Sequence, residues 1–372
     1  MKVGELLSPA LLIDIDRLDR NIEEMASKAD ESGVNLRPHI KTHKCIEIGT
    51  RQRKAGARGI TVSTPAEAQA FADAGFKDIT YAVPLAPDKF KVMLGISREV
   101  SLKVLVDGII TVDLLTEFCR ENNAEFEVLL KVNCGNDRVG VDPKSQSALK
   151  LAERISQKLN FQGILAHAGQ SYSTKSGEEI KKIAEHEQNI MIDFANTLKA
   201  NGIESETVSI GSTPTARLAD SFKEGITEIR PGNYVFFDYT QVALGTCDVS
   251  DVALTVLASV ISAAPSRVVI DAGGTALSKD AGPTHIDGFG GYGKVIRDYE
   301  KDLIEDQLTL SSLSQEHGKI TTASEHSLKP GDRLRIIPNH SCLTANLFEH
   351  YHVVQGDSVV EKWKINRQRL KT

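Results

Sequence analysis

Residues 59–83 read GITVSTPAEAQAFADAGFKDITYAV, which is a strand, a capped helix and a second strand in direct succession. The first and last five residues are rich in β-branched and apolar side chains, which predicts strands. Between them, Thr64, Pro65 and Glu67 are placed as the N-cap, the first helical residue and the acidic partner of a capping box. Gly75 is placed to end the helix. A single helix between two strands returns the chain over the sheet, so this unit predicts parallel strands.

The same alternation continues along the first two thirds of the chain. Strands are predicted at 35–40, 59–63, 79–83, 102–106, 126–132, 163–167, 207–211 and 226–230. Eight strands alternating with single helices over roughly 200 residues are typical of a (β/α)8 TIM barrel. We therefore predict an α/β fold with such a barrel at residues 8–245.

The pattern changes after about residue 245. Strand-like runs follow at 252–261, 267–271 and 333–338, with turns between them and no helix of comparable strength. This predicts a second domain of mainly antiparallel β structure at residues 246–372, which residues 1–7 are expected to join.

The composition is that of a globular protein with no general affinity for polyanions. Of 372 residues, 41% are hydrophobic, and 44 basic against 50 acidic residues give a net charge of −6. This balance disfavours nonspecific binding to nucleic acid or to an anionic membrane. No window reaches the roughly 18 consecutive apolar residues of a membrane helix, and the N-terminus lacks the features of a signal peptide. The five cysteines form no Cys-x-x-Cys, so we expect a reducing, cytoplasmic location rather than a disulfide framework.

The loop after the first predicted strand is strongly basic. Residues 36–44 read LRPHIKTHK, and barrel active sites lie at the carboxyl ends of the strands. A lysine in that position, Lys41, lies beside arginine and histidine cations that lower an amine pKa, and such an amine can form a Schiff base. From this run alone, a solvated basic loop is the simpler interpretation.

The loops after the seventh and eighth predicted strands point to a phosphate. They read SIGSTPT at 209–215 and EIRPGNY at 228–234, so each combines a glycine with hydroxyl or amide donors. Barrels most often hold a phosphate at these two loops, where backbone N–H groups beside Gly211 and Gly232 can approach its oxygens. Either loop alone would be an ordinary turn. Together, and opposite a lysine, they favour pyridoxal phosphate.

Two further loops make the pattern specific. KVNCGNDRVG at 131–140 follows the fifth predicted strand, and HAGQSY at 167–172 ends the sixth. The order and spacing of these segments resemble the fold-type III pyridoxal-phosphate enzymes, the alanine racemase-like group. The run RPHIKTHK at 37–44 resembles, more narrowly, the branch that contains D-serine dehydratase and D-threonine aldolase. The resemblance covers essentially the whole chain.

The resemblance implies a role for each candidate residue. Lys41 is the Schiff-base lysine, Arg138 faces the phenolic oxygen of the cofactor, and Tyr172 or Arg230 lies near the pyridine nitrogen. The segment 211–213 with residues 232 and 233 takes the phosphate. The implied cofactor-binding set is Lys41, Arg138, His167, Tyr172, Gly211, Ser212, Thr213, Arg230, Gly232 and Asn233.

A candidate metal pair lies in the second predicted domain. PNHSCLTAN at 338–346 follows a predicted strand, and residues two apart on an extended segment face the same side, so His340 and Cys342 can converge on one ion. An imidazole and a thiolate suit zinc, with positions left for water and substrate. Without the resemblance, a buried histidine beside an inert cysteine is the simpler interpretation. The resemblance implies a divalent metal here, Zn²⁺ or another such as Mn²⁺, with His-x-Cys in dehydratases and His-x-Asp in several aldolases.

The expected function is that of a pyridoxal-phosphate- and zinc-dependent lyase. We expect a D-serine dehydratase-like enzyme that eliminates water from a D-β-hydroxy amino acid to a 2-oxo acid and ammonia, with Lys41 taking the α-proton. One alternative is retro-aldol cleavage to glycine and an aldehyde. Another is a non-catalytic pyridoxal-phosphate-binding protein. A homodimer is implied by the resemblance, and the substrate is a small D-amino acid whose identity the sequence leaves open.

Overall fold

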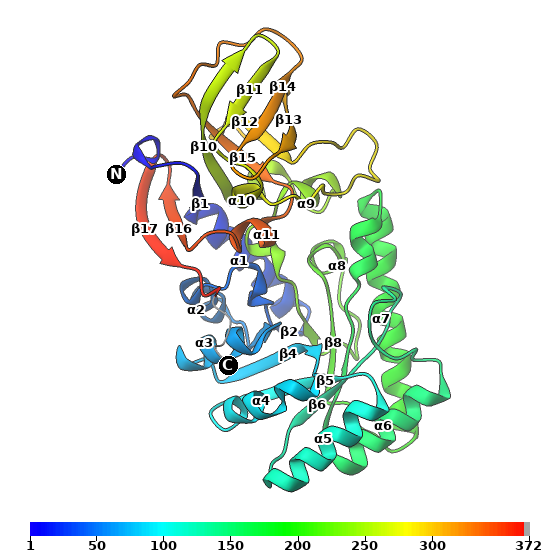
Figure 1. Cartoon of the computed structure of the whole chain (residues 1–372). Coiled ribbons are helices and arrows are strands. Elements are labelled where there is room, and N and C mark those ends of the chain that lie inside the picture. The colour runs from blue at the N-terminus through cyan, green and yellow to red at the C-terminus, as the bar shows by residue number, and fades with distance from the viewer. Residues whose placement is uncertain (368–372) are drawn as a thin grey trace. The chain divides into compact units, whose positions relative to one another are not determined.

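The computed structural model describes residues 1–367, which form two compact units (Figure 1). The barrel unit comprises residues 24–41 and 48–232, and the β unit comprises residues 1–23, 42–47 and 233–367. Residues 368–372, which the sequence assigned to the second domain, lie outside the described residues. Within residues 1–367, no helix has the length and apolar character that crossing a membrane requires.

The barrel unit is built around an eight-stranded parallel sheet, as predicted. The strands are β2 (Asn35–Leu36), β3 (Ile60–Val62), β4 (Asp78–Pro84), β5 (Ser101–Val106), β6 (Glu127–Lys131), β7 (Asn160–Leu165), β8 (Thr207–Ile210) and β9 (Glu228–Ile229). Their order is β2-β9-β8-β7-β6-β5-β4-β3. The N–H of Arg58 donates to the Leu36 carbonyl at 3.0 Å and that of Thr61 to the Pro38 carbonyl at 2.8 Å, which joins the first strand to the second. These bonds close the sheet, so the predicted (β/α)8 barrel is confirmed.

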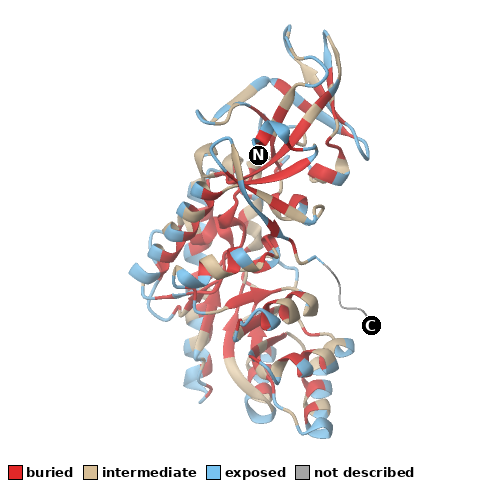
Figure 2. Cartoon of the chain, turned by 90° about the vertical axis from the view of Figure 1, so that its left-hand side faces the viewer, coloured by how far each residue is buried: buried red, intermediate tan, exposed pale blue. Residues whose placement is uncertain are grey.

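One helix follows each of the first seven barrel strands. The helices are α2 (Ile46–Lys54), α3 (Pro65–Asp73), α4 (Phe90–Ser97), α5 (Ile109–Asn122), α6 (Gln146–Lys158), α7 (Gly177–Ala200) and α8 (Thr213–Leu218), and α1 (Ile15–Glu31) precedes the first strand. Figure 2 shows buried strands and helices whose outer faces are exposed. This burial explains the alternation of apolar runs and amphipathic segments in the sequence.

The cap predicted for α3 is present with one change. The Thr64 hydroxyl accepts the Glu67 N–H at 3.1 Å, and Pro65 begins the helix. The Glu67 carboxylate reaches one residue further back than a capping box requires, because it accepts the N–H of Ser63 at 2.7 Å. The helix ends at Asp73 with Ala74 as its C-cap, and Gly75 has a φ of +85°, which favours glycine.

The β unit holds a nine-stranded sheet. Its strands are β1 (Ala10–Asp14), β10 (Leu254–Ala264), β11 (Arg267–Ile270), β12 (Gly293–Asp298), β13 (Leu303–Leu313), β14 (Gly318–Thr322), β15 (Arg333–Pro338), β16 (His350–Gln355) and β17 (Ser358–Lys364). Three short helices accompany them, α9 (Tyr239–Ala243), α10 (Gly274–Leu277) and α11 (Ser341–Ala345). The order is β11-β14-β13-β12-β15-β10-β1-β16-β17, and a further pairing of β11 with β10 closes six of these strands into a ring. All but one of the pairings are antiparallel, which confirms the predicted β domain.

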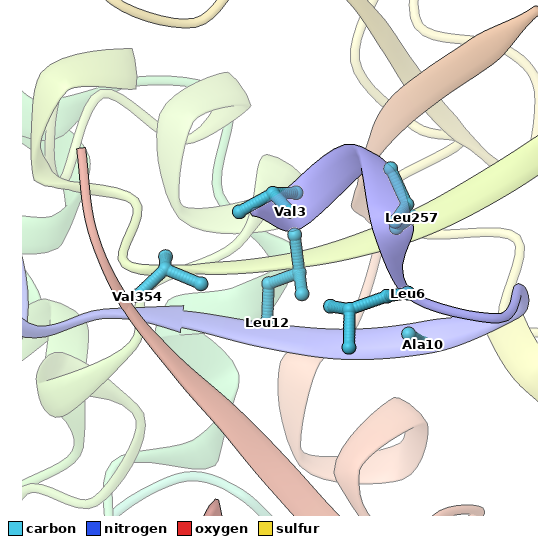
Figure 3. Packing of buried hydrophobic residues seen from close by; sticks show 6 residues of the cluster. All are labelled: Val3, Leu6, Ala10, Leu12, Leu257 and Val354. Atoms are coloured by element: carbon cyan, nitrogen blue, oxygen red, sulfur yellow. The ribbon is translucent and has the colours of Figure 1, made fainter. Parts of the chain in front are cut away.

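Strand β1 falls within the residues that the sequence assigned to the barrel, yet it pairs in the β unit. It lies antiparallel to β10 and parallel to β16. Its first four residues, 10–13, are all buried, so the strand needs a neighbour on both edges and cover on both faces. Figure 3 shows part of that cover, a cluster formed by Val3, Leu6, Ala10, Leu12, Leu257 and Val354.

A buried ionic network lies inside the barrel unit. Arg37, at the end of β2, donates from Nε to the Glu228 carboxylate and from Nη1 to the Asp78 carboxylate at 2.7 Å. Arg37 and Glu228 are 5% and 4% exposed. The arginine of the basic run therefore serves the barrel interior, because a guanidinium out of water requires charged partners.

Replacing Arg37 with leucine is expected to cost about 3–5 kcal/mol of unfolding free energy, since it leaves the Glu228 carboxylate buried without its cation. Urea unfolding of the full chain measures the loss. The control is Arg154→Leu, which removes an exposed pair with Asp113 and is expected to cost no more than about 1 kcal/mol. Equal losses in the two variants would contradict the buried network.

Candidate active site

Basic side chains from several strand ends gather at the carboxyl end of the barrel. Lys41 lies in a 3₁₀ turn after β2, Lys131 is the last residue of β6, and Arg230 follows β9. His39 and His167 follow β2 and β7. Besides burial, the charges of Lys41 and Arg230 lower the pKa of both imidazoles, so these side chains lie near one another. The five residues form what we call the cationic cluster.

The two histidines of this cluster are neutral. Burial, and then the charge of Lys41, lowers the pKa of His167 to about 3 and that of His39 well below its ordinary value. The Nδ1 atom of His167 lies 3.1 Å from the Gly211 carbonyl, so a neutral ring donates from Nδ1 and keeps Nε2 as an acceptor. The Nε2 atom of His39 lies 3.1 Å from the Ser63 hydroxyl. Its Nδ1 is buried and has no hydrogen-bond partner within residues 1–367.

Lys131 is a second amine of the cluster, and the sequence analysis did not single it out. It is 4% exposed. Burial, and then the charge of Arg230, lowers the pKa of Lys131 to about 8, and the charge of Arg138 acts in the same direction. The signal for Lys131 was its place as the last residue of a barrel strand.

The cluster fits an anionic ligand that also carries an aldehyde. Lysine and arginine cations gather around an imidazole nitrogen that lacks a partner in the described part of the chain. Such a set suits a phosphate ester and a phenolate, and a lysine amine suits an aldehyde. Pyridoxal phosphate has these three groups, so the residues present fit this cofactor.

The loop after β8 is held by its own side chains. The N–H of Ser212 donates to the Thr215 hydroxyl at 3.0 Å, and that of Gly232 donates to the Thr213 hydroxyl at 3.2 Å. Gly211 has a φ of +112°, and a side chain there would bring Cβ within 3.2 Å of the Arg230 nitrogen. The glycine is therefore needed for the backbone conformation, and hydroxyls of the loop already occupy two of the N–H groups that we expected to face a phosphate.

Three further residues that the sequence predicted to bind the cofactor lie outside the cationic cluster defined above. Arg138 is exposed, and Tyr172 is half-buried in the 3₁₀ turn Gly169–Ser173 after β7. Asn233 lies in the β unit, where its Nδ2 donates to the Asp238 carboxylate at 2.7 Å and to the Ser341 hydroxyl at 2.8 Å. Its Oδ1 is buried without a partner among the described residues.

The predicted metal pair comes together, but the geometric reason given for it was wrong. Cys342 does not lie on an extended segment, because it belongs to the first turn of α11, and His340 is the N-cap of that helix. The two side chains are nevertheless hydrogen-bonded to each other. The turn into the helix, rather than strand alternation, makes them converge.

The hydrogen bond between these two side chains shifts the pKa of both groups. Burial alone would lower the pKa of His340, but hydrogen bonds to Asp280 and Cys342 raise it to about 11. Burial alone would raise the pKa of the Cys342 thiol, but the hydrogen bond to His340 lowers it. A thiolate beside an imidazole is a donor set that suits a divalent metal such as zinc, so the residues fit the predicted ion. In residues 1–367, no group of three His, Cys, Asp or Glu side chains could hold a metal.

Asp280 supports this pair and was missed by the sequence analysis. Its carboxylate lies 3.0 Å from Nδ1 of His340. A carboxylate behind a ligating histidine fixes the orientation of the ring and raises its basicity. The two residues are 60 positions apart, so no local spacing could reveal the contact.

Two hydrogen bonds connect the Cys342 sulfur to segments that the sequence assigned to the cofactor. The sulfur lies 3.3 Å from the Thr42 hydroxyl and 3.7 Å from Nδ2 of Asn233. Thr42 follows Lys41 in the chain, and Asn233 follows Gly232. Both bonds lie within the β unit, and Asn233 is itself one of the residues predicted to bind the cofactor.

Comparison with known proteins identifies the family. Residues 13–240 match the family described as alanine racemase, N-terminal domain, and residues 253–354 match the putative serine dehydratase domain. The chain belongs to the alanine racemase-like family. It is an enzyme, a pyridoxal-phosphate-dependent lyase, as its dehydratase and aldolase relatives indicate. This finding sets aside the alternative of a non-catalytic binding protein.

Three relatives of this lyase cover nearly all of its length. D-serine dehydratase of Dictyostelium discoideum is 38% identical, with 98% of each chain covered. D-threo-3-hydroxyaspartate dehydratase of Delftia sp. is also 38% identical, with 96% of each chain covered. D-threonine aldolase of Arthrobacter sp. is 30% identical, with 96% of this chain and 92% of the aldolase covered.

Solved structures of D-threo-3-hydroxyaspartate dehydratase superpose closely on the lyase. One, from Delftia sp., is 36% identical, covers 100% of both chains and has a TM-score of 0.94. A cysteine-to-alanine variant of a D-threo-3-hydroxyaspartate dehydratase is described as metal-free and has a TM-score of 0.93, with 36% identity and 100% of both chains covered. A histidine-to-alanine variant has also been solved, and the two substituted positions lie two apart.

Lowering the pH is expected to destabilise the lyase partly through His167. Its pKa is about 3 in the folded protein against an ordinary value of 6.5, so the unfolded chain binds more protons between these values. The unfolding free energy then falls as the pH drops from 6.5 toward about 3. Urea unfolding at several pH values checks this, and His167→Gln should show a shallower decline. Parallel curves for the two proteins would contradict the neutral, buried imidazole.

Replacing Asp280 with alanine is expected to weaken metal binding by about 10- to 100-fold, because the ring of His340 loses its orienting carboxylate. Titration of the metal-depleted protein with Zn²⁺ measures the affinity. Asp287→Ala provides the control, since its carboxyl belongs to the same connection between α10 and β12. Unchanged affinity in Asp280→Ala would show that Asp280 does not support a metal ligand.

Proposed function

We propose that this lyase is a D-serine dehydratase-like enzyme that uses pyridoxal phosphate and a divalent metal, most simply Zn²⁺. It eliminates water across Cα and Cβ of a D-β-hydroxy amino acid and releases a 2-oxo acid and ammonia. The pairing of Cys342 with His340, whose Nδ1 lies 3.0 Å from the Asp280 carboxylate, carries this proposal, because a cysteine beside an imidazole is a donor set that suits a divalent metal. The D-serine and D-threo-3-hydroxyaspartate dehydratase relatives support it.

The barrel residues would hold the cofactor. Lys41 would bind its aldehyde carbon, and the predicted cofactor-binding residues that lie in the barrel unit, together with Lys131, would surround its ring and phosphate ester. When bound, pyridoxal phosphate supplies an electron sink that stabilises negative charge at Cα. The cationic cluster formed by Lys41, Lys131 and Arg230 supports this arrangement, since it offers charge to both the phosphate and the phenolate.

Lys41 has the second task of moving a proton. Its Nζ would take the α-proton of the substrate from one face, and a base fixed on one face selects the D over the L configuration. His39 and His167 support this role, because both rings are neutral and neither adds a positive charge that would hinder the approach of a proton to Lys41.

His340 and Cys342 would hold the metal, with Asp280 orienting the imidazole. A bound divalent cation supplies Lewis acidity, which makes a hydroxyl a better leaving group. The metal-free description of the cysteine variant of D-threo-3-hydroxyaspartate dehydratase supports this assignment, as does the two-residue spacing between the substituted cysteine and histidine. The Thr42 hydroxyl and the Asn233 amide would hold the sulfur in place.

Retro-aldol cleavage to glycine and an aldehyde is the second candidate function. The relative that favours it is D-threonine aldolase, at 30% identity. The cofactor, the lysine and the metal would serve either reaction, so Cys342 in place of an aspartate is the residue that favours elimination.

A product analysis tests the proposal. The purified full-length enzyme is incubated with D-serine, D-threonine and D-threo-3-hydroxyaspartate, with and without a metal chelator. We expect a 2-oxo acid and ammonia that depend on the metal. Glycine with an aldehyde would favour the aldolase, and turnover that is insensitive to exhaustive chelation would refute the metal assignment.

We also propose a homodimer, as the family resemblance implies. Light scattering of the purified protein at micromolar concentration tests it, and the mass of a single chain would refute it.

A further inference from the structure

Glu187 is a buried carboxylate that the proposed reaction does not use. It lies on the inward face of α7, between Ala184 and Met191, and it is 0% exposed. An apolar residue would be the ordinary occupant of such a position. A carboxylate there is costly unless hydrogen bonds replace its water.

Those hydrogen bonds come from the loops at the carboxyl end of the barrel. Oε1 of Glu187 accepts the N–H of Gly211 at 3.1 Å, and Oε2 accepts the hydroxyl of Thr215 at 3.4 Å. The backbone N–H of Ala168 and the thiol of Cys134, at 4.0 Å, are further partners. These residues follow β8, β7 and β6, so a single carboxylate ties three neighbouring loops to one outer helix.

Two of the hydrogen bonds to Glu187 come from the segment that follows β8. Glu187 holds both ends of the segment 211–215, which comprises the short loop after β8 and the first turn of α8, through Gly211 and Thr215. Between these points the Ser212 hydroxyl lies 3.0 Å from that of Ser171, which links the loop to the turn after β7. Gly211 has a positive φ, which favours glycine, and its N–H donates to Glu187 on α7. The loop conformation is thus set without a ligand.

We propose that Glu187 is a positioning residue that presets the loop 211–215 to receive the phosphate ester of the cofactor. The inference rests on the proposed function, since it takes pyridoxal phosphate as the ligand. Glu187 acts through the loop and does not touch the phosphate, because its oxygens are occupied by Gly211 and Thr215. A loop ordered in advance binds more tightly, since binding then loses less conformational entropy.

Two substitutions separate hydrogen bonding from volume. Glu187→Gln keeps an acceptor for the Gly211 N–H and a polar partner for Thr215, whereas Glu187→Met fills the same space without either bond. Gln188→Met is the matched control. Gln188 is the next residue of α7 and is equally buried, but it bonds to Ser221 and Lys223, outside the loop 211–215.

The measurement compares pyridoxal phosphate with pyridoxal, which lacks the phosphate. Both are titrated into the cofactor-depleted full chain, and the visible absorbance of the adduct gives the dissociation constants. We expect Glu187→Met to weaken the binding of pyridoxal phosphate by about 10- to 100-fold and the binding of pyridoxal by less than about threefold. Glu187→Gln should restore pyridoxal phosphate binding to within about threefold of the natural chain, and Gln188→Met should leave the ratio of the two constants unchanged.

A purely structural role would lower thermal stability without changing that ratio. If Glu187→Met leaves the ratio of the two dissociation constants unchanged, which means that both ligands lose the same factor in affinity, the inference is overturned and the proposed function still stands. If the natural chain forms no borohydride-reducible adduct on Lys41 with either aldehyde, both the inference and the proposed function fail.

Discussion

Replacing Lys41 with alanine is expected to reduce turnover of a D-β-hydroxy amino acid by about 10⁴-fold, because the variant would lack both the amine that we propose binds the cofactor and the proposed base for the α-proton. The charge of Lys41 acts on His39 and His167, which places the amine in the cationic cluster of the barrel. Steady-state kinetics measures the loss. Borohydride reduction followed by peptide mass analysis locates the adduct, which should be on Lys41 in the natural chain and absent in the variant.

Lys44→Ala is the matched control for this experiment. Lys44 belongs to the same basic run, but its Nζ donates to Oδ1 of Asn346 at 2.7 Å in the β unit. Its loss is expected to leave the adduct in place and to change turnover by no more than a few fold. An adduct and full turnover in Lys41→Ala, or an adduct that maps to Lys131, would remove the basis of the proposed chemistry.

Replacing Cys342 with alanine is expected to abolish tight metal binding and to lower turnover by about 10²- to 10³-fold, since Lewis acidity at the leaving group contributes several kcal/mol. Cys342 would be one of two metal ligands, and its partner His340 is held by Asp280. Metal analysis of the purified protein and the rate with D-serine measure the two effects. The cofactor adduct on Lys41 should persist, because Cys342 would not bind the cofactor.

Cys119→Ala is the control for the loss of a thiol. Cys119 is buried on α5 of the barrel unit, where it packs as an apolar side chain. This variant should retain its metal and its turnover, whatever it loses in stability. Full activity in metal-free Cys342→Ala would contradict the metal site while leaving the cofactor assignment intact.

The local signals of the sequence predicted most of the fold. Each barrel strand is a short apolar run, and the cap at Thr64 is formed within four residues, so both can be read from neighbours in the chain. The strand Ala10–Asp14 could not be assigned in this way. Its partners are β10 and β16, more than 200 residues further along, and an apolar run does not specify its neighbour in a sheet.

The candidate-site residues also divide into those that the sequence predicted and those that only the structure revealed. Lys41 was predicted because it follows a barrel strand, and parallel strands bring their carboxyl ends together. His167 and Arg230 were predicted from the family resemblance. His340 and Cys342 were predicted from the family resemblance, although the strand geometry invoked for them was wrong. Asp280 and Glu187 were not predicted, since a carboxylate is ordinary on a surface and only burial reveals it as unusual.

The order of strand, helix and cap along the chain was sufficient to determine a parallel barrel, a β domain and the loops that carry the chemistry, because these depend on residues close in sequence. Which groups are charged, paired or held still was decided by the tertiary structure alone. Burial changes the pKa of His167, Lys131 and Cys342. Contacts across 24 and 60 residues attach Glu187 to Gly211 and Asp280 to His340. Desolvation and long-range hydrogen bonding arise only when distant segments exclude water together, so no local pattern can encode them.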